Sequence, residues 1–238
     1  MSNIISITKK EFRSYFNSPI AYIFIITFLV ITSWLFFRPF FVVDQASMRP
    51  FFSLLPWVFL FFIPSITMRL WAEEKKLGTI ELLMTWPITD LEAVLGKFFA
   101  SFAFLAITIL LTFPIPITVS LLGNADIGPI IGGYVGTFFL GAAYLSIGLF
   151  ISSLTENQII AFILSTILIF LLFIIGEEFV LVTIPTRLAP IFSFLGLGYH
   201  FDNICRGVLD SRDLFYYLSV IIFFLFLNIR SLESRKWK

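Results

Sequence analysis

Residues 64–98 read PSITMRLWAEEKKLGTIELLMTWPITDLEAVLGKF, and this stretch decides the fold because it is the one sizeable water-soluble segment between strongly apolar ones. Its charges are densest in the run EEKK at 73–76. Gly78 predicts a break after that run, and Thr79 is placed to cap a short helix. Pro87 predicts the end of this helix after about two turns. The stretch therefore predicts a short helix in a polar connection between two apolar spans.

The short helix carries apolar side chains that the connection is too small to bury: Ile80, Leu82, Leu83 and Met84. We therefore expect something outside the segment to cover them. A second helix is expected directly afterwards, because Thr89 and Glu92 fit a capping box, in which each side chain bonds a free backbone amide. This helix should continue without interruption into the next apolar span.

The whole chain has the composition of an integral membrane protein. Hydrophobic residues make up 59% of it and charged residues 13%, against about 25% charged in soluble domains, and its mean hydropathy is +0.99. A hydrocarbon core of ~30 Å requires roughly 20 apolar residues per helix. The runs do not alternate with period 2, which argues against a barrel. We predict one all-α transmembrane domain over 1–238, with six helical spans near 20–37, 51–70, 98–122, 130–154, 158–175 and 214–229.

The basic residues predict how the chain is oriented. Eleven of them lie on the side of both termini and of the 64–98 stretch, and five lie on the other side. With eight acidic residues on the first side and seven on the second, the two sides carry +3 and −2. The side richer in lysine and arginine should be cytoplasmic, so we expect both termini inside a bacterial cytoplasmic membrane. The net charge of +1 also argues against nucleic acid as a partner.

Residues 1–18 are expected to form an amphipathic helix that lies on the inner membrane surface. A cleaved signal peptide is the competing interpretation, but the charged region is long and no small-residue cleavage site follows Phe37. On a helical wheel, two groups of residues fall on opposite arcs: Ile4, Ile5, Phe12, Tyr15 and Phe16 on the apolar one, and Lys9, Lys10 and Arg13 on the polar one.

Prolines and glycines predict irregularities inside the spans. Pro56 and Pro64 suggest kinks or an interruption in the second span, and Pro114 suggests a break near the outer end of the third. In the fourth span, Gly132 and Gly136 fit the close-approach pattern of packed membrane helices, which could mark a subunit interface.

The segment 176–213 is too apolar to be a plain external loop. We expect re-entrant helices in it, buried against the spans. His200, Asp202 and Cys205 lie close together there, but one histidine and one cysteine are too few ligands for an ordinary metal site. We therefore expect a packed segment and no metal.

The sequence lacks the residues that several functional classes of membrane protein require. No span carries an ionisable residue away from its ends, which argues against ion-coupled transport. The Gly96–Lys97 pair lacks the glycine spacing of a phosphate-binding loop, so the chain should not hydrolyse ATP or bind a cofactor itself. A membrane-embedded hydrolase is poorly supported, because no nucleophile has a histidine base within plausible reach.

Three stretches carry a resemblance to a known family: KKEFRSYFNSPIAYIF at 9–24, PSITMRLWAEEKKLGTIELLMTWPIT followed by VLGKF at 64–98, and RGVLDSRDLFYYLSVIIFFLFL at 206–227. Together they resemble the ABC-2 type permease subunits of ATP-binding-cassette (ABC) transporters, over nearly the whole chain. The branch associated with gliding-motility proteins is the most similar.

This resemblance implies that 71–97 is a cytoplasmic coupling segment whose helix docks in a groove of a separate ATPase subunit. The matching residues are Gly78, Thr79, Ile80, Glu81, Leu82 and Leu83, with Met84 on the same helix. It also implies a second permease subunit, identical or different, and ATP and magnesium bound by the ATPase.

We expect the substrate path to be apolar and aromatic, because the chain has 32 phenylalanines and uncharged spans. That suits export of a lipid-like, glycan-linked or amphipathic substrate, although phenylalanine facing lipid explains the abundance equally simply. The alternative is a mechanotransmission subunit that relays ATPase strokes to an external partner and moves no substrate.

Overall fold

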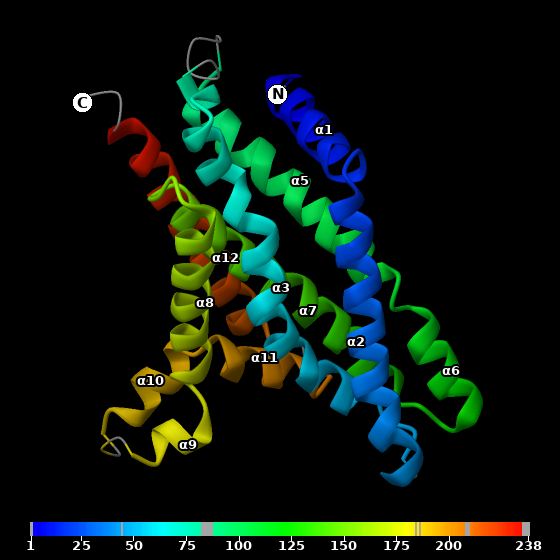
Figure 1. Cartoon of the computed structure of the whole chain (residues 1–238). Helices are drawn as coiled ribbons and strands as arrows, with labels where there is room; N and C mark the ends of the chain where they lie inside the picture. The colour runs from blue at the N-terminus through cyan, green and yellow to red at the C-terminus, as the bar shows by residue number, and fades with distance from the viewer. Residues whose placement is uncertain are drawn as a thin grey trace.

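The computed structural model describes residues 2–43, 45–81, 88–183, 185, 187–207 and 210–234, and no β-strand occurs within these ranges (Figure 1). The helices are α1 (Ser2–Phe16), α2 (Pro19–Val43), α3 (Arg49–Lys76), α5 (Asp90–Leu110), α6 (Pro114–Leu122), α7 (Ile127–Ser152), α8 (Gln158–Ile174), α9 (Glu178–Leu181), α10 (Ala189–Leu195), α11 (Leu197–Cys205) and α12 (Ser211–Glu233).

Within the described residues, five stretches are long and apolar enough to cross a membrane: α2, α3, α5 with α6, α7 and α12. The all-helical, multi-pass membrane class predicted from composition therefore agrees with the structure. The predicted span 158–175 corresponds to α8, which has 17 residues and is about 26 Å long at ~1.5 Å per residue. It falls short of the other five in length, so the count of six stays a prediction.

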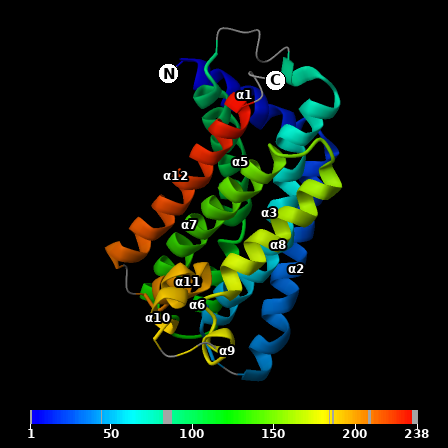
Figure 2. The same cartoon turned by 90° about the vertical axis from the view of Figure 1, so that its left-hand side faces the viewer.

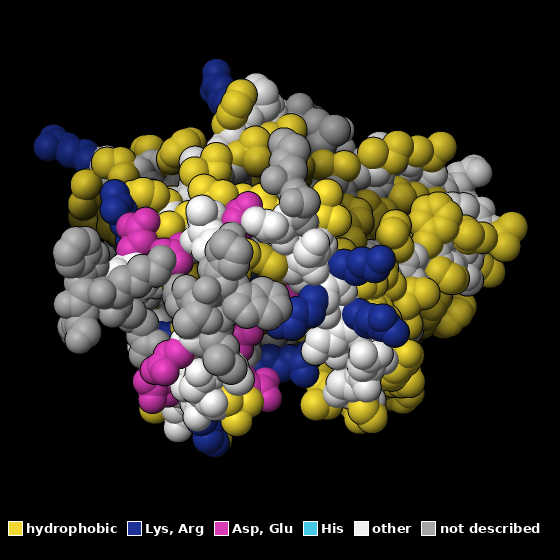
Figure 3. Space-filling view, turned by 90° about the horizontal axis from the view of Figure 1, so that it is seen from above, with side chains coloured by type: hydrophobic (Ala, Val, Ile, Leu, Met, Phe, Trp, Pro, Cys, Tyr) yellow, Lys and Arg dark blue, Asp and Glu magenta, His cyan; other side chains and the backbone are white. Residues whose placement is uncertain are grey.

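The two ends of the bundle differ. The start of α1 and the end of α12 lie at one end, which we call the terminal end, while α9, α10 and α11 gather at the other (Figures 1 and 2). Both views show α8 running lengthwise between the two ends. Seen from the terminal end, charged side chains gather on the face turned to the viewer and hydrophobic ones cover much of the periphery (Figure 3).

Helix α7 lies in the middle of the bundle and is buried along most of its length (Figures 1 and 2). Its glycines permit this, because they let three neighbouring helices approach closely: Gly133 lies against Phe52 of α3, Gly141 against Leu105 of α5, and Gly132 and Gly136 against Ile204 of α11. The Gly132–Gly136 pair predicted as a possible subunit interface therefore packs against a helix of the same chain.

The predicted irregularities turn out differently in the two spans. Helix α3 continues through both Pro56 and Pro64, so the predicted interruption is wrong. The third span does break, at three turn residues before Pro114, where α5 ends and α6 begins. Proline at the first position of α6 needs no hydrogen-bond acceptor, which explains why a new helix starts there.

The segment between α8 and α12 is largely helical, as expected for 176–213. Its best-packed part is α11, whose Leu197, Phe201 and Ile204 are buried in the core. The Tyr217 hydroxyl of α12 donates to the Leu197 carbonyl, 2.7 Å away, which anchors the start of α11. Its depth in a membrane stays a prediction.

Candidate functional site

Within the predicted coupling segment 71–97, the described residues that follow the end of α3 are 77–81, and we use the name coupling segment for these residues. Leu77 closes α3, and Gly78 follows with a φ of +69°, a left-handed conformation that glycine adopts without steric cost. The break predicted at Gly78 is therefore confirmed. The Leu77 side chain is 67% exposed, so the turn projects an apolar group into the surroundings.

The Thr79 hydroxyl bonds back to α3. It donates to the Glu74 carbonyl, 3.3 Å away, and so connects the segment to the last turn of that helix. The amide at position 82, to which a capping hydroxyl would bond, lies outside the described residues, so the cap at Thr79 stays a prediction.

The remaining predicted coupling residues divide into two groups. Ile80 is only 6% exposed and belongs to the hydrophobic core, so this chain covers it. Glu81 is exposed. Leu82, Leu83 and Met84 lie outside the described residues.

The capping box that starts α5 is confirmed in both halves. The Thr89 hydroxyl accepts from the Glu92 amide at 3.3 Å, and the Glu92 carboxylate accepts from the Thr89 amide at 3.0 Å. The side-chain amide of Asn3 donates to both Glu92 oxygens at 3.3 Å. The start of α5 is thereby fixed to the start of α1.

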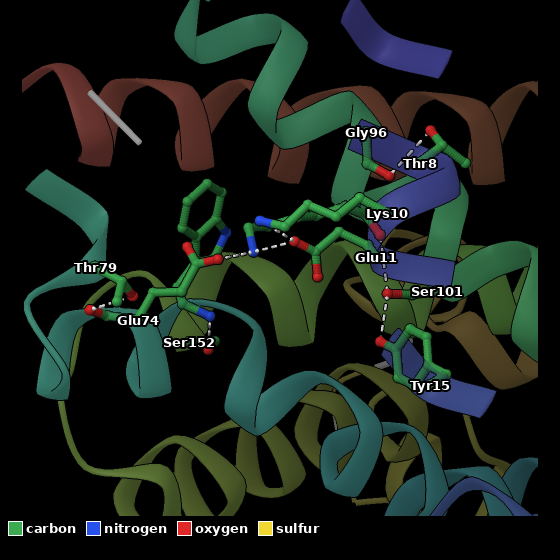
Figure 4. A network of polar contacts seen from close by, with 11 residues as sticks. Thr8, Lys10, Glu11, Tyr15, Glu74, Thr79, Gly96, Ser101 and Ser152 are labelled. Carbon is green, nitrogen blue, oxygen red and sulfur yellow. Dashed lines mark hydrogen bonds and ion pairs between the residues drawn. The ribbon is translucent and has the colours of Figure 1, made fainter. Parts of the chain in front are cut away.

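A buried polar cluster lies beneath the coupling segment, and sequence reasoning missed it (Figure 4). Lys97 of α5 is 1% exposed, and its ammonium lies 2.7 Å from the carboxylate of Glu74 on α3 and 3.4 Å from that of Glu11 on α1. The same ammonium lies 4.8 Å from the ring centroid of Trp71, a cation–π distance. We call these four residues the Lys97 cluster.

The Lys97 cluster joins three helices at the point where the coupling segment begins. Glu74 contributes its carboxylate to Lys97 and its backbone carbonyl to Thr79, so one residue contacts both the cluster and the segment. An ion pair that is mostly removed from water constrains geometry strongly, because separating the charges leaves them poorly solvated. The contacts therefore connect residue 79, through Glu74, with α5 and α1.

A second connection fastens α3 to α7. The Ser152 hydroxyl accepts from the backbone amides of Trp71 and Ala72 at 3.1 and 3.2 Å, and it donates to the Met68 carbonyl at 3.0 Å. A side chain from one helix thus inserts beside the backbone ladder of another, an arrangement that bends helices. The Lys75 ammonium donates to the Ser153 carbonyl close by.

Helix α1 packs along the first half of α5, with both helices running in the same direction. The Thr8 hydroxyl donates to the Gly96 carbonyl at 3.2 Å, and the Tyr15 and Ser101 hydroxyls lie 3.0 Å apart. A Cβ atom at Gly96 would lie 2.5 Å from Ile7, so glycine permits the close approach. Burial raises the pKa of Tyr15 to about 12.

The predicted interfacial residues lie away from this contact. Lys9, Lys10 and Arg13 are exposed, and Phe12 is half-buried. The polar arc of α1 is therefore exposed, with Lys10 3.9 Å from Glu11, while Tyr15 faces the bundle. Contact of α1 with lipid stays a prediction.

Among the described residues, no group of three histidine, cysteine, aspartate or glutamate side chains could hold a metal ion. Of the three residues that are close in sequence, His200 pairs with Asp213 of α12 instead of Asp202 or Cys205. Sequence reasoning missed this pair, although an aspartate at the start of the last span is a recognisable signal.

A family model described as "ABC-2 family transporter protein" matches residues 5–229, which is nearly the whole chain. No curated protein matches the chain.

Proposed function

Because the chain belongs to the ABC-2 family of transporter proteins, we propose that it is a permease subunit coupled to a separate ATPase through a helix at residues 79–86. The family is a membrane component of ABC transporters and implies an ABC ATPase as partner. The ATPase binds ATP and magnesium, and this chain supplies no catalytic residue.

The coupling proposal rests on the hydrogen bond from the Thr79 hydroxyl to the Glu74 carbonyl. Leu77, Gly78, Thr79 and Glu81 are all exposed at the terminal end, while Thr79 is bonded to Glu74 and through it to Lys97. An exposed segment that is bonded to a well-packed part of the bundle is suited to contact with a partner that moves, such as an ATPase. The buried Ile80 adds an apolar anchor beneath the same segment.

The proposed topology has six spans, with both termini and the coupling segment in the cytoplasm of a bacterium. The excess of eleven basic residues over five supports this orientation, and the common position of the chain ends supports an even number of crossings (Figure 1). The sixth crossing is α8, whose length of about 26 Å approaches the ~30 Å of a hydrocarbon core.

We propose that two such permease subunits, identical or different, form an export path for a lipid-like, glycan-linked or amphipathic substrate. Apolar spans with abundant phenylalanine support this substrate class. The alternative is a mechanotransmission subunit that relays ATPase strokes to an external partner and moves no substrate. ATP-dependent flux of an amphipathic probe in vesicles that contain both subunits distinguishes the two, because only an exporter moves it.

The coupling proposal is tested with Glu81→Lys and Leu82→Ala. Buried contacts at protein interfaces are typically worth ~1–3 kcal/mol each, so either substitution should weaken ATPase association or ATPase stimulation about tenfold. The matched control is Glu233→Lys, an exposed glutamate at the end of α12 whose substitution should leave both unchanged. Association is measured by co-purification and by the ATPase rate at graded subunit ratios.

Unchanged association and stimulation in both variants would contradict coupling through this helix. A second test collapses the proton gradient at constant ATP in vesicles. Transport should persist, because no ionisable residue lies in the middle of a span. A proportional loss of transport would instead indicate ion coupling.

A further inference from the structure

A pocket of about 400 Å³ lies at the end of the bundle opposite the termini, where α10, α11 and α12 meet. Phe194 comes from α10, Tyr199 and Asn203 from α11, and Arg206 from the turn that follows. Arg212 lies in the first turn of α12. Neither the coupling segment nor the Lys97 cluster contributes to it.

One wall of the pocket is the buried pair of His200 and Asp213. The Nδ1 atom of His200 lies 2.6 Å from the Asp213 carboxylate, and its Nε2 atom lies 2.8 Å from the Phe194 carbonyl. Both contacts occupy the ring nitrogens of His200, so the histidine is held in the wall of the pocket. The Asp213 carboxylate is thereby engaged within the wall.

The second acidic residue of the pocket is also engaged. The Asp210 carboxylate accepts from the Arg212 backbone amide at 2.9 Å and so caps α12. A carboxylate at a helix start is held there by the amide and by the helix dipole. The acidic side chains around the pocket therefore already have structural partners.

Four polar side chains of the pocket have no bonded partner. Within the part of the chain that the structure describes, no hydrogen bond or ion pair involves the guanidinium groups of Arg206 and Arg212, the Asn203 amide or the Tyr199 hydroxyl. Asp202 lies near enough to Arg206 to interact electrostatically but does not line the pocket. The amide and the hydroxyl can donate or accept, whereas the two guanidinium groups can only donate, so a ligand of the arginines must supply acceptors.

The charges restrict the ligand further. Arg206 and Arg212 oppose Asp210 and Asp213, so the formal charges of these four lining residues balance. Without an excess of positive charge there is little long-range attraction for an anion, and recognition must come from the geometry of the guanidinium groups. A guanidinium fork matches two oxygens of a phosphate, and two forks can share one phosphate group.

We propose that this pocket binds a phosphate group through Arg206 and Arg212. The half-exposed rings of Phe194 and Tyr199 lie at the same pocket and can contact an apolar group attached to the phosphate. The phosphate can come from a lipid headgroup or from a soluble phosphate ester. The site does not depend on the proposed coupling to an ATPase, since it belongs to this chain alone.

The test uses the purified full chain in a nonionic maltoside detergent and calorimetric titration at low ionic strength. The probes are inorganic phosphate, dihexanoyl phosphatidic acid below its micellar concentration, and the uncharged dihexanoylglycerol. The variant is Arg206→Gln with Arg212→Gln. The matched control is Arg187→Gln, an exposed arginine of the same region that does not line the pocket.

The double variant should bind the charged probes at least tenfold more weakly, while the control binds as the unaltered chain does. Arg206→Lys with Arg212→Lys keeps both charges but loses the forks, so it should show an intermediate loss. If inorganic phosphate and phosphatidic acid bind equally, the site exists and a soluble phosphate is a sufficient ligand. If only phosphatidic acid binds, the site exists and its ligand is a lipid headgroup.

Four outcomes overturn the proposal. The first three are that neither charged probe binds, that the double Gln variant binds like the unaltered chain, and that dihexanoylglycerol binds as tightly as the phosphatidic acid. The fourth is an equal loss in Arg187→Gln, because the effect is then one of general surface charge. Size-exclusion profiles of all variants establish that the exposed substitutions leave the fold intact.

Discussion

Replacing Lys97 by methionine tests whether the Lys97 cluster holds the terminal end of the bundle together. The substitution keeps the length of the side chain but removes the buried cation that lies 2.7 Å from Glu74 and 3.4 Å from Glu11. Removing one partner of a buried ion pair typically costs ~3–5 kcal/mol. The two carboxylate side chains remain 20% and 15% exposed, so water screens them in part and we expect about 3 kcal/mol. Methionine keeps a contact with the Trp71 ring, which limits any further loss.

The free energy of unfolding is measured by titration with a denaturing detergent, with helix content as the signal. Lys10→Met is the matched control, because Lys10 is 66% exposed, lies 3.9 Å from Glu11 and should contribute less than ~1 kcal/mol. Adding Glu11→Gln and Glu74→Gln to Lys97→Met should recover most of the loss, since no unbalanced charge then remains. A cost for Lys97→Met no larger than that for Lys10→Met would refute the reasoning.

Two further predictions concern α7 and α11. Gly132→Ala places a Cβ atom against the Ile204 carbonyl and should lower the free energy of unfolding by ~1–3 kcal/mol. The control Gly128→Ala meets no atom within 4 Å and should be neutral or stabilising by up to ~1 kcal/mol in the same titration. Equal effects of the two substitutions would contradict the packing of α7 on α11. Burial and nearby Asp202 raise the pKa of the Cys205 thiol, so little reactive thiolate exists at pH 7. Alkylation of Cys205 should therefore be at least tenfold slower in the native protein than in denatured protein, and its rate should rise with pH. Equal rates in the two states would show that the thiol is not buried.

The features that sequence reasoning found are those encoded within a few residues. Gly78 ends α3, Thr89 and Glu92 cap α5, and the third span breaks before Pro114, because each depends on backbone geometry or on neighbours three residues away. The long apolar runs likewise predicted the membrane class. Interactions between residues close in sequence determine these elements, so they do not depend on how the rest of the chain folds.

The features that it missed join residues far apart in the chain. Lys97 looked like one of several charges on the inner side, since nothing near it indicates that Glu11 and Glu74 converge on it from two other helices. The bond from the Thr79 hydroxyl to a carbonyl of α3, five residues back across a turn, was missed for a related reason. Tertiary contacts, which no local pattern reports, decided both.

The position of the Ser152 hydroxyl has a consequence for measurements of exchange with solvent deuterium. The amide protons of Trp71 and Ala72 are bound by a group that belongs to α7, so their protection depends on α7 staying against α3 as well as on α3 remaining helical. A separation of the two helices would release these two protons while their neighbours on α3 stayed protected. The exchange rates of the Trp71 and Ala72 amides should therefore report relative movement between α3 and α7 without any label or substitution.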